Sequence, residues 1–146
     1  MNDERPLCGH QRARELYLNE RGSEQFEAFI LRQERAAISR LTALEFRCLL
    51  ARRRRAQELS PQAETDVFRQ FRSDVFNGYL EVHPLLDEHA HTAIKLLERF
   101  KEHPLRTLDT LHLAIAAALD IALLATADHV MARAAVAMGF QVEVFG

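Results

Sequence analysis

Short apolar segments alternate with helix-length amphipathic segments along most of the chain, and this alternation restricts the fold more than any other feature. Strands are expected at residues 36–39, 80–83, 122–126 and 142–145. Helices are expected at residues 23–33, 41–57, 60–78, 87–100, 107–119 and 128–138. Such alternation favours a parallel sheet covered by helices. We therefore predict an α/β fold in which ligands bind at the carboxyl ends of the strands.

Two of the expected helices begin with capping signals. Thr42 is predicted to cap the 41–57 helix, and Glu45, three residues later, completes a capping-box pattern. Ser60 is predicted to cap the next helix, because it precedes Pro61 and proline is favoured in a first helical turn. In this interpretation Glu45 has a purely structural use.

The composition suits one folded domain over residues 1–146, of which residues 1–15 form an atypical N-terminal segment. The 146 residues are 48% hydrophobic, which is typical of globular proteins. No apolar run reaches the ~18 residues of a membrane span, so no membrane association is expected. The first residues lack the apolar core of a signal peptide, and Cys8 and Cys48 have no metal-binding spacing. We therefore expect a reduced, cytoplasmic protein.

The charge of the chain is nearly balanced, with a formal net charge of −2 at pH 7. Total charge therefore predicts no polyanionic partner. The run Arg52-Arg53-Arg54-Arg55 is locally dense and permits two interpretations. Cations at a helix end offset the helix dipole, whereas arginine forks also match phosphate oxygens. The helix-end interpretation is the simpler one.

Three acidic residues stand beside apolar sequence instead of on a solvated face. Glu45 lies in LTALEFRCLL, Asp109 opens the most hydrophobic helix, and Asp128 follows an apolar strand. Each has a structural explanation: a capping-box acid, a first-turn acid and an N-cap. If the three converge, however, their repulsion calls for a cation, and Mg²⁺ or Mn²⁺ prefers oxygen ligands. Such an ion can polarise a phosphate and activate a water.

Four segments, in their order along the chain, resemble PIN domains of the VapC toxin type. The segment at residues 16–24, LYLNERGSE, resembles the stretch after the first motif of that family. The second motif is resembled by SRLTALEFRCLLARR, the third by LRTLDTLHLAIAAAL and the fourth by LLATADHVMARAAVAMGFQV. The similarity covers the chain from Leu16 to Phe145.

The resemblance implies a PIN-like three-layer fold, with a short parallel sheet flanked by helices and an altered first strand. It implies that Glu45, Asp109 and Asp128 are catalytic carboxylates that bind Mg²⁺ or Mn²⁺, and that Thr126 orients a water or ligand. The family's reaction is metal-dependent endonucleolytic cleavage of RNA. Its members usually form homodimers, and a cognate antitoxin protein neutralises them by filling the active-site groove.

The first motif of the family is missing or degenerate. An aspartate at the end of the first strand should fall near Gly9, but residues 7–12 are LCGHQR. Asp3 and Glu4 lie too far upstream for this register. We therefore expect this segment not to form a central strand, which would leave neighbouring strand edges unpaired. We also expect a lower metal affinity, because one carboxylate is lost.

Several further residues have two interpretations each. Arg106 and Arg133 flank the acids in sequence, so they either hold RNA phosphates or form surface ion pairs. His112 follows Asp109 by one turn, so it either contacts RNA or a ligand, or is a buried, hydrogen-bonded histidine. His89 and His91 are expected on a helix surface.

Two functions of different classes remain open at this point. The retained acids favour a metal-dependent endoribonuclease that acts as the toxin of a toxin–antitoxin pair. The missing aspartate favours a catalytically inactive PIN-like domain that binds an antitoxin, RNA or itself. A third interpretation, an unrelated α/β structural domain, requires the three acids to point apart.

Overall fold

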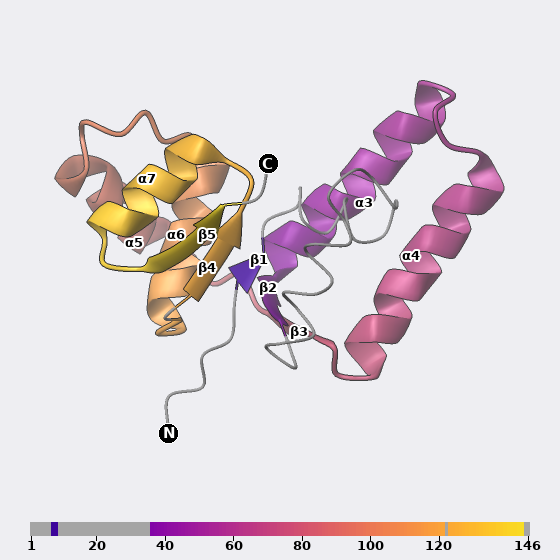
Figure 1. Cartoon of the computed structure of the whole chain (residues 1–146), viewed down its shortest axis with the longest axis horizontal. Coiled ribbons are helices and arrows are strands. Elements are labelled where there is room, and N and C mark those ends of the chain that lie inside the picture. Colours follow the sequence, from indigo (N-terminus) through magenta and orange to yellow (C-terminus); the bar gives the residue numbers. More distant parts are fainter. Residues whose placement is uncertain (1–6, 9–35, 122, 145–146) are drawn as a thin grey trace.

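The computed structural model describes residues 7–8, 36–121 and 123–144 of the chain (Figure 1). The strands are β1 (Leu7–Cys8), β2 (Ala36–Ser39), β3 (Leu80–His83), β4 (Leu123–Thr126) and β5 (Gln141–Val144). The helices are α3 (Arg40–Arg55), α4 (Pro61–Phe76), α5 (Asp87–Arg99), α6 (Thr107–Ala118) and α7 (His129–Ala137). The helix expected at residues 23–33 lies outside the described residues. The other elements are present, and their ends differ from the expected ones by two residues at most.

The strands form one parallel sheet in the order β3-β2-β1-β4-β5. The sequence crosses from one side of β1 to the other between β3 and β4, through α5 and α6. Helices flank the sheet: α3 and α4 lie beside β2 and β3, and α5, α6 and α7 lie beside β4 and β5 (Figure 1). The predicted α/β fold with a short parallel sheet is confirmed.

The central strand is β1, which corrects the expectation for the N-terminal segment. Leu7 pairs with Ala37 of β2 and also with Leu124 of β4, and Cys8 pairs with Ala125. The prediction that this segment would not supply a central strand was therefore wrong, and the facing edges of β2 and β4 are paired. A strand of two residues depends on its backbone pairing with the neighbouring strands, so a long apolar run is not required.

Two hydrophobic clusters hold the sheet and its helices together. One cluster joins α3 and α4 to β2 and β3, with Phe46, Leu50 and Phe71 packed against Ile38 and Leu80. The other joins α5, α6 and α7 to β4; its buried members include Leu96, Leu113, Leu124, Met131 and Ala134. Both clusters extend across β1: Ala37 and Leu124 belong to the cluster of α5, α6 and α7, whereas Ile38 and Ala125 belong to the cluster of α3 and α4. Because successive side chains of a strand point to opposite faces, the two clusters cover the two faces of the sheet.

Helix α3 begins directly at the end of β2 without a loop. Ser39 is its N-cap: the Ser39 hydroxyl accepts a hydrogen bond from the Thr42 N–H at 3.1 Å, and Arg40 is already helical. The prediction that Thr42 caps this helix, with Glu45 as capping-box acid, was therefore wrong, because the helix starts too early in the chain. The predicted cap of α4 is confirmed, since the Ser60 hydroxyl accepts from the Ala63 N–H at 3.0 Å.

The carboxyl ends of the strands gather at one edge of the sheet. Ser39 of β2 pairs with His83 of β3, and Thr126 of β4 pairs with Val144 of β5. Helices α3 and α7 both start at this edge, directly after β2 and shortly after β4.

None of the helices in the described part of the chain combines the length and the apolar character that a membrane span requires.

Candidate functional site

A pocket of about 760 Å³ lies where the starts of α6 and α7 approach α3. Glu45 of α3, Asp109 of α6 and Asp128 at the start of α7 all line this pocket. The structure therefore brings the three sequence-predicted acids to one place, although they come from separate parts of the chain.

Asp109 lies in the first turn of α6, where it has a local structural role. Its Oδ2 accepts a hydrogen bond from the Arg106 N–H at 3.2 Å. The Thr110 hydroxyl donates to the Arg106 carbonyl oxygen at 2.8 Å, which stabilises the same turn. A carboxylate offers about four lone-pair positions, so this one bond leaves Asp109 capable of binding a ligand.

Asp128 is the N-cap of α7. Its Oδ1 accepts a hydrogen bond from the Met131 N–H at 3.0 Å. Its own N–H donates to the Thr126 hydroxyl at 3.0 Å. Thr126 is only 3% exposed and does not line the pocket, so its visible contact is with the backbone of Asp128. The role of Thr126 in orienting a water or ligand stays a prediction.

Glu45 reaches across to α6, where its carboxylate meets a histidine. Glu45 Oε1 and His112 Nε2 are 2.5 Å apart. The side chain of His112 is 5% exposed and that of Glu45 is 14% exposed. Of the two interpretations of His112, the structure shows the buried, hydrogen-bonded one.

The sequence did not identify His112 as the partner of Glu45. The two residues are 67 positions apart, so no local pattern connects them. The only sequence signal was the position of His112 three residues after Asp109, which places both on the same side of one helix.

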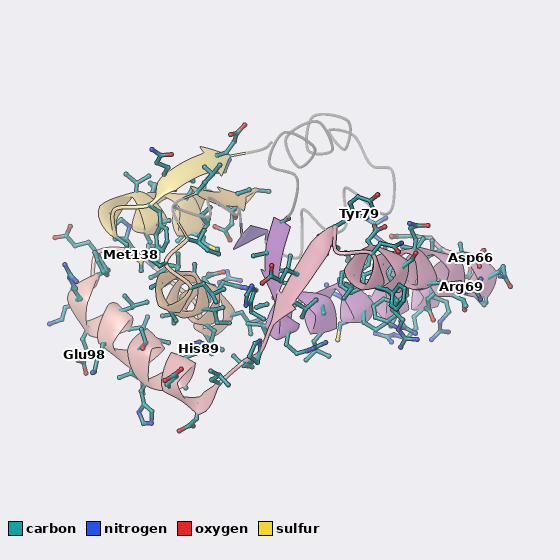
Figure 2. The ribbon with its side chains drawn as sticks, turned by 90° about the horizontal axis from the view of Figure 1, so that it is seen from below. Asp66, Arg69, Tyr79, His89, Glu98 and Met138 are labelled. Atoms are coloured by element: carbon teal, nitrogen blue, oxygen red, sulfur yellow. The ribbon has the colours of Figure 1, made fainter. Side chains whose placement is uncertain are left out.

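Two other histidines, His89 and His91, lie on α5. His89 was expected at a helix surface, but it is 5% exposed. Its Nδ1 accepts a hydrogen bond from the Leu86 N–H at 2.9 Å, at the start of the helix (Figure 2). The surface expectation was therefore wrong for His89 and right for His91, whose side chain is 73% exposed. A histidine can be buried at a helix start because its ring nitrogen replaces water as the acceptor of a backbone N–H.

The arginines named from the sequence occupy different positions. Arg106 is exposed and lines the pocket, so a guanidinium is available beside the acids. Arg133 is exposed on α7 and does not line the pocket. The four consecutive arginines occupy the last turn of α3, and Arg54 among them donates to Glu64 Oε2 at 2.7 Å. For Arg54 the structural use at a helix end is therefore the one observed.

The donor chemistry of the pocket fits a hard divalent cation, because three carboxylates from three elements contribute only oxygen atoms. These carboxylates line the pocket without converging on one point: among the described residues, no group of three or more His, Cys, Asp or Glu side chains is arranged to hold a metal ion. Each of the three acids is engaged in a hydrogen bond, which is local for Asp109 and Asp128 and joins two helices for Glu45. The residues therefore supply oxygen ligands of the appropriate kind, and binding an ion would require the three side chains to move closer together.

Comparison with known protein families identifies the class of this molecule. The PIN domain family model matches residues 15–137, which is most of the chain, and the chain therefore belongs to the PIN domain family. Comparison with curated proteins gave no match.

Solved structures of VapC-type proteins have the same fold. The toxin VapC20 from Mycobacterium tuberculosis, described as cleaving the sarcin-ricin loop, superposes with a TM-score of 0.69 at 16% identity. A chain of VapBC2 from Rickettsia felis, solved bound to a DNA fragment from its promoter, gives 0.65 at 17% identity. Each comparison covers 96% of this chain and 98% of the other chain. The PIN-like fold implied by the sequence resemblance is thus confirmed.

Proposed function

We propose that this protein is a metal-dependent endoribonuclease and the toxin of a toxin–antitoxin pair. The observation that carries the proposal is the presence of Glu45, Asp109 and Asp128 in one pocket beside the carboxyl edge of the sheet. Membership in the PIN domain family supports it, as does the likeness in fold to a toxin described as cleaving the sarcin-ricin loop.

The residues of the pocket have distinct roles in this proposal. Glu45, Asp109 and Asp128 hold Mg²⁺ or Mn²⁺. When bound, such an ion polarises a phosphate and lowers the pKa of a water, which is the chemistry that phosphodiester hydrolysis requires. Arg106, exposed at the pocket, binds a phosphate oxygen and fixes the position of the RNA backbone. Arg133 lies outside the pocket, where it contacts more distant phosphates.

The proposed partners follow from the same assignment. The substrate is RNA, which the protein cleaves in the cytoplasm, and a cognate antitoxin protein occupies the pocket and blocks it. Helix α5 exposes two apolar side chains, Ile94 and Leu97, which are 56% and 43% exposed. They are candidates for contact with a second copy of the chain, and the molar mass in solution measures whether a homodimer forms.

Cleavage of RNA by the purified protein tests the proposed activity. Wild type should cleave RNA in Mg²⁺ or Mn²⁺ and not in EDTA, and Asp109→Asn should lose at least ~100-fold in kcat, since it removes a ligand charge. Asp87→Asn is the matched control: Asp87 is also a first-turn acid, on α5, and does not line the pocket. Cleavage that survives EDTA or Asp109→Asn would contradict the proposal.

One observation favours a second candidate function, a PIN domain that binds its partners without cleaving RNA. The central strand β1 ends at Cys8, and the sequence has no acidic residue between Glu4 and Glu15. The carboxyl end of this strand therefore carries no carboxylate of its own. A folded wild-type protein that neither binds Mn²⁺ nor cleaves RNA would establish this second candidate.

A further inference from the structure

The hydrogen bond between Glu45 and His112 connects two helices that belong to different hydrophobic clusters, on opposite faces of the sheet. Glu45 belongs to α3, which packs with α4, β2 and β3, whereas His112 belongs to α6, which packs with α5, α7 and β4. The bond lies at the pocket that Glu45 lines. The position of the Glu45 carboxylate therefore depends on how α3 and α6 are joined.

Helix α6 contributes to the pocket twice. Asp109 lines the pocket directly, and His112, three residues later on the same side of the helix, bonds Glu45. One rigid helix thus carries one acid and fixes the position of a second. Helix α6 therefore determines the position of the Glu45 carboxylate relative to that of Asp109.

The chemistry of the contact defines its direction. An ionised carboxylate only accepts hydrogen bonds, so Nε2 of His112 is the donor and Glu45 Oε1 the acceptor. The Nδ1 atom of His112 is buried and has no hydrogen-bond partner among the described residues. The contact with Glu45 is therefore the only polar use that the described structure shows for this imidazole.

A hydrogen bond of this kind can order a metal-binding side chain before the cation binds. A glutamate side chain has several rotatable bonds, and ordering it costs conformational entropy. His112 fixes that side chain before a cation arrives, through one of two carboxylate oxygens. Groups that hold metal ligands in this way typically change metal affinity or activity about 10–100-fold when they are replaced.

We propose that His112 is a positioning residue, which holds the Glu45 carboxylate at the pocket for a divalent cation. This inference rests on the proposed function, because it assigns Glu45 as a ligand. His112 itself touches neither the cation nor the RNA. Its effect is therefore expected mainly in metal affinity.

Two amide substitutions at position 112 test whether the hydrogen bond to Glu45 matters, because both side chains are polar but only one is long enough to form the bond. The amide nitrogen of glutamine is as far from Cβ as Nε2 of histidine, so His112→Gln can still donate to Glu45. The asparagine amide corresponds to Nδ1, so His112→Asn cannot reach Glu45.

Mn²⁺ binding to the full-length, metal-free protein is followed by electron paramagnetic resonance. His112→Asn should weaken Mn²⁺ binding about 10–100-fold, and His112→Gln should retain most of it.

His89 provides a matched control, because it uses the other ring nitrogen in its hydrogen bond. It is as buried as His112, but it accepts a backbone hydrogen bond through Nδ1 on α5 and does not line the pocket. His89→Gln should therefore lower the melting temperature more than His89→Asn, and neither should change Mn²⁺ affinity. This control separates the loss of a buried histidine from the loss of the Glu45 contact.

The outcomes distinguish this inference from the proposed function. Unchanged or tighter Mn²⁺ binding by folded His112→Asn, or an equal loss in the asparagine and glutamine variants, would overturn the positioning role. If RNA cleavage still depends on metal in that case, the proposed function stands. A wild type without Mn²⁺ binding would overturn both. If His112→Asn does not fold, a folded His112→Gln with strongly weakened binding would overturn the inference, and retained binding would support it.

Discussion

Ser39 shows how one side chain determines where an element begins. It is fully buried at the junction of β2 and α3, and its hydroxyl accepts from the Thr42 N–H. Ser39→Ala should lower the free energy of unfolding by about 1 kcal/mol, because an N-cap acceptor is lost. Urea unfolding measures this change. An unchanged free energy of unfolding would mean that Ser39 does not cap α3.

For single residues, short sequence patterns predicted some members of the candidate site better than others. Asp128 and Asp109 lie at helix starts, where the sequence shows both the preceding loop and the apolar helix, so their capping roles could be anticipated. For Glu45, the alternative role as a capping-box acid was wrong, because the sequence does not show that α3 begins at Arg40. Its contact with His112 depends on how α3 and α6 pack together, which no local pattern contains.

Among the elements, α3 and α4 are joined by a charged contact in addition to their aromatic packing. Glu64 of α4 accepts hydrogen bonds from Arg47 at 3.1 Å and from Arg54 at 2.7 Å. Figure 2 shows Asp66 and Arg69, further along the exposed side of α4, pointing away from the sheet. Burial of the Glu64 carboxyl opposes its ionisation, but the hydrogen bonds and charges of Arg54 and Arg47 outweigh this effect. They hold the pKa of Glu64 below its usual value of 4.5.

The lowered pKa of Glu64 makes this helix contact sensitive to pH. Because the folded-state pKa lies below 4.5, the stabilisation by ionised Glu64 is complete above pH 4.5 and is lost as the pH falls through the folded-state value. Glu64→Gln should therefore lower the urea midpoint at pH 7, and its difference from wild type should shrink toward pH 3.

The control for the Glu64 prediction is another acid near the same helix pair. Glu58 is paired with Arg53 at 3.8 Å, and its side chain is 59% exposed. Exposed pairs contribute little to stability, so Glu58→Gln should have a small effect at any pH. If the Glu64→Gln difference stayed constant from pH 7 to pH 3, the charged contact would not stabilise the α3–α4 pair.

The elements also show which parts of the fold the sequence could predict. Helices such as α4 and α6 were predictable because each has a capping residue or a long apolar face, and only their ends moved by one or two residues. Strand β1 was not predictable. Its two residues are too few to show a periodic pattern, and its place in the sheet comes from pairing with β2 and β4.

For the whole molecule, the candidate site lies where helices from the two hydrophobic clusters approach each other. The two clusters cover opposite faces of the sheet, since Ala37 and Leu124 belong to one and Ile38 and Ala125 to the other. The acids come from both groups of helices: Glu45 from α3 on one face, and Asp109 and Asp128 from the starts of α6 and α7 on the other. The sequence predicted these acids through their unusual surroundings and the PIN resemblance, whereas their meeting in one pocket follows from the order of strands in the sheet.

We propose that Glu45, Asp109 and Asp128 bind a divalent cation together, although the central strand ends without an acid. Diffraction from crystals soaked in Mn²⁺, measured near the manganese absorption edge, shows whether and where the ion binds. We predict an anomalous peak in the pocket, within coordinating distance of Glu45, Asp109 and Asp128. A folded protein whose pocket shows no peak at saturating Mn²⁺, or whose peak lies away from these carboxylates, would contradict it.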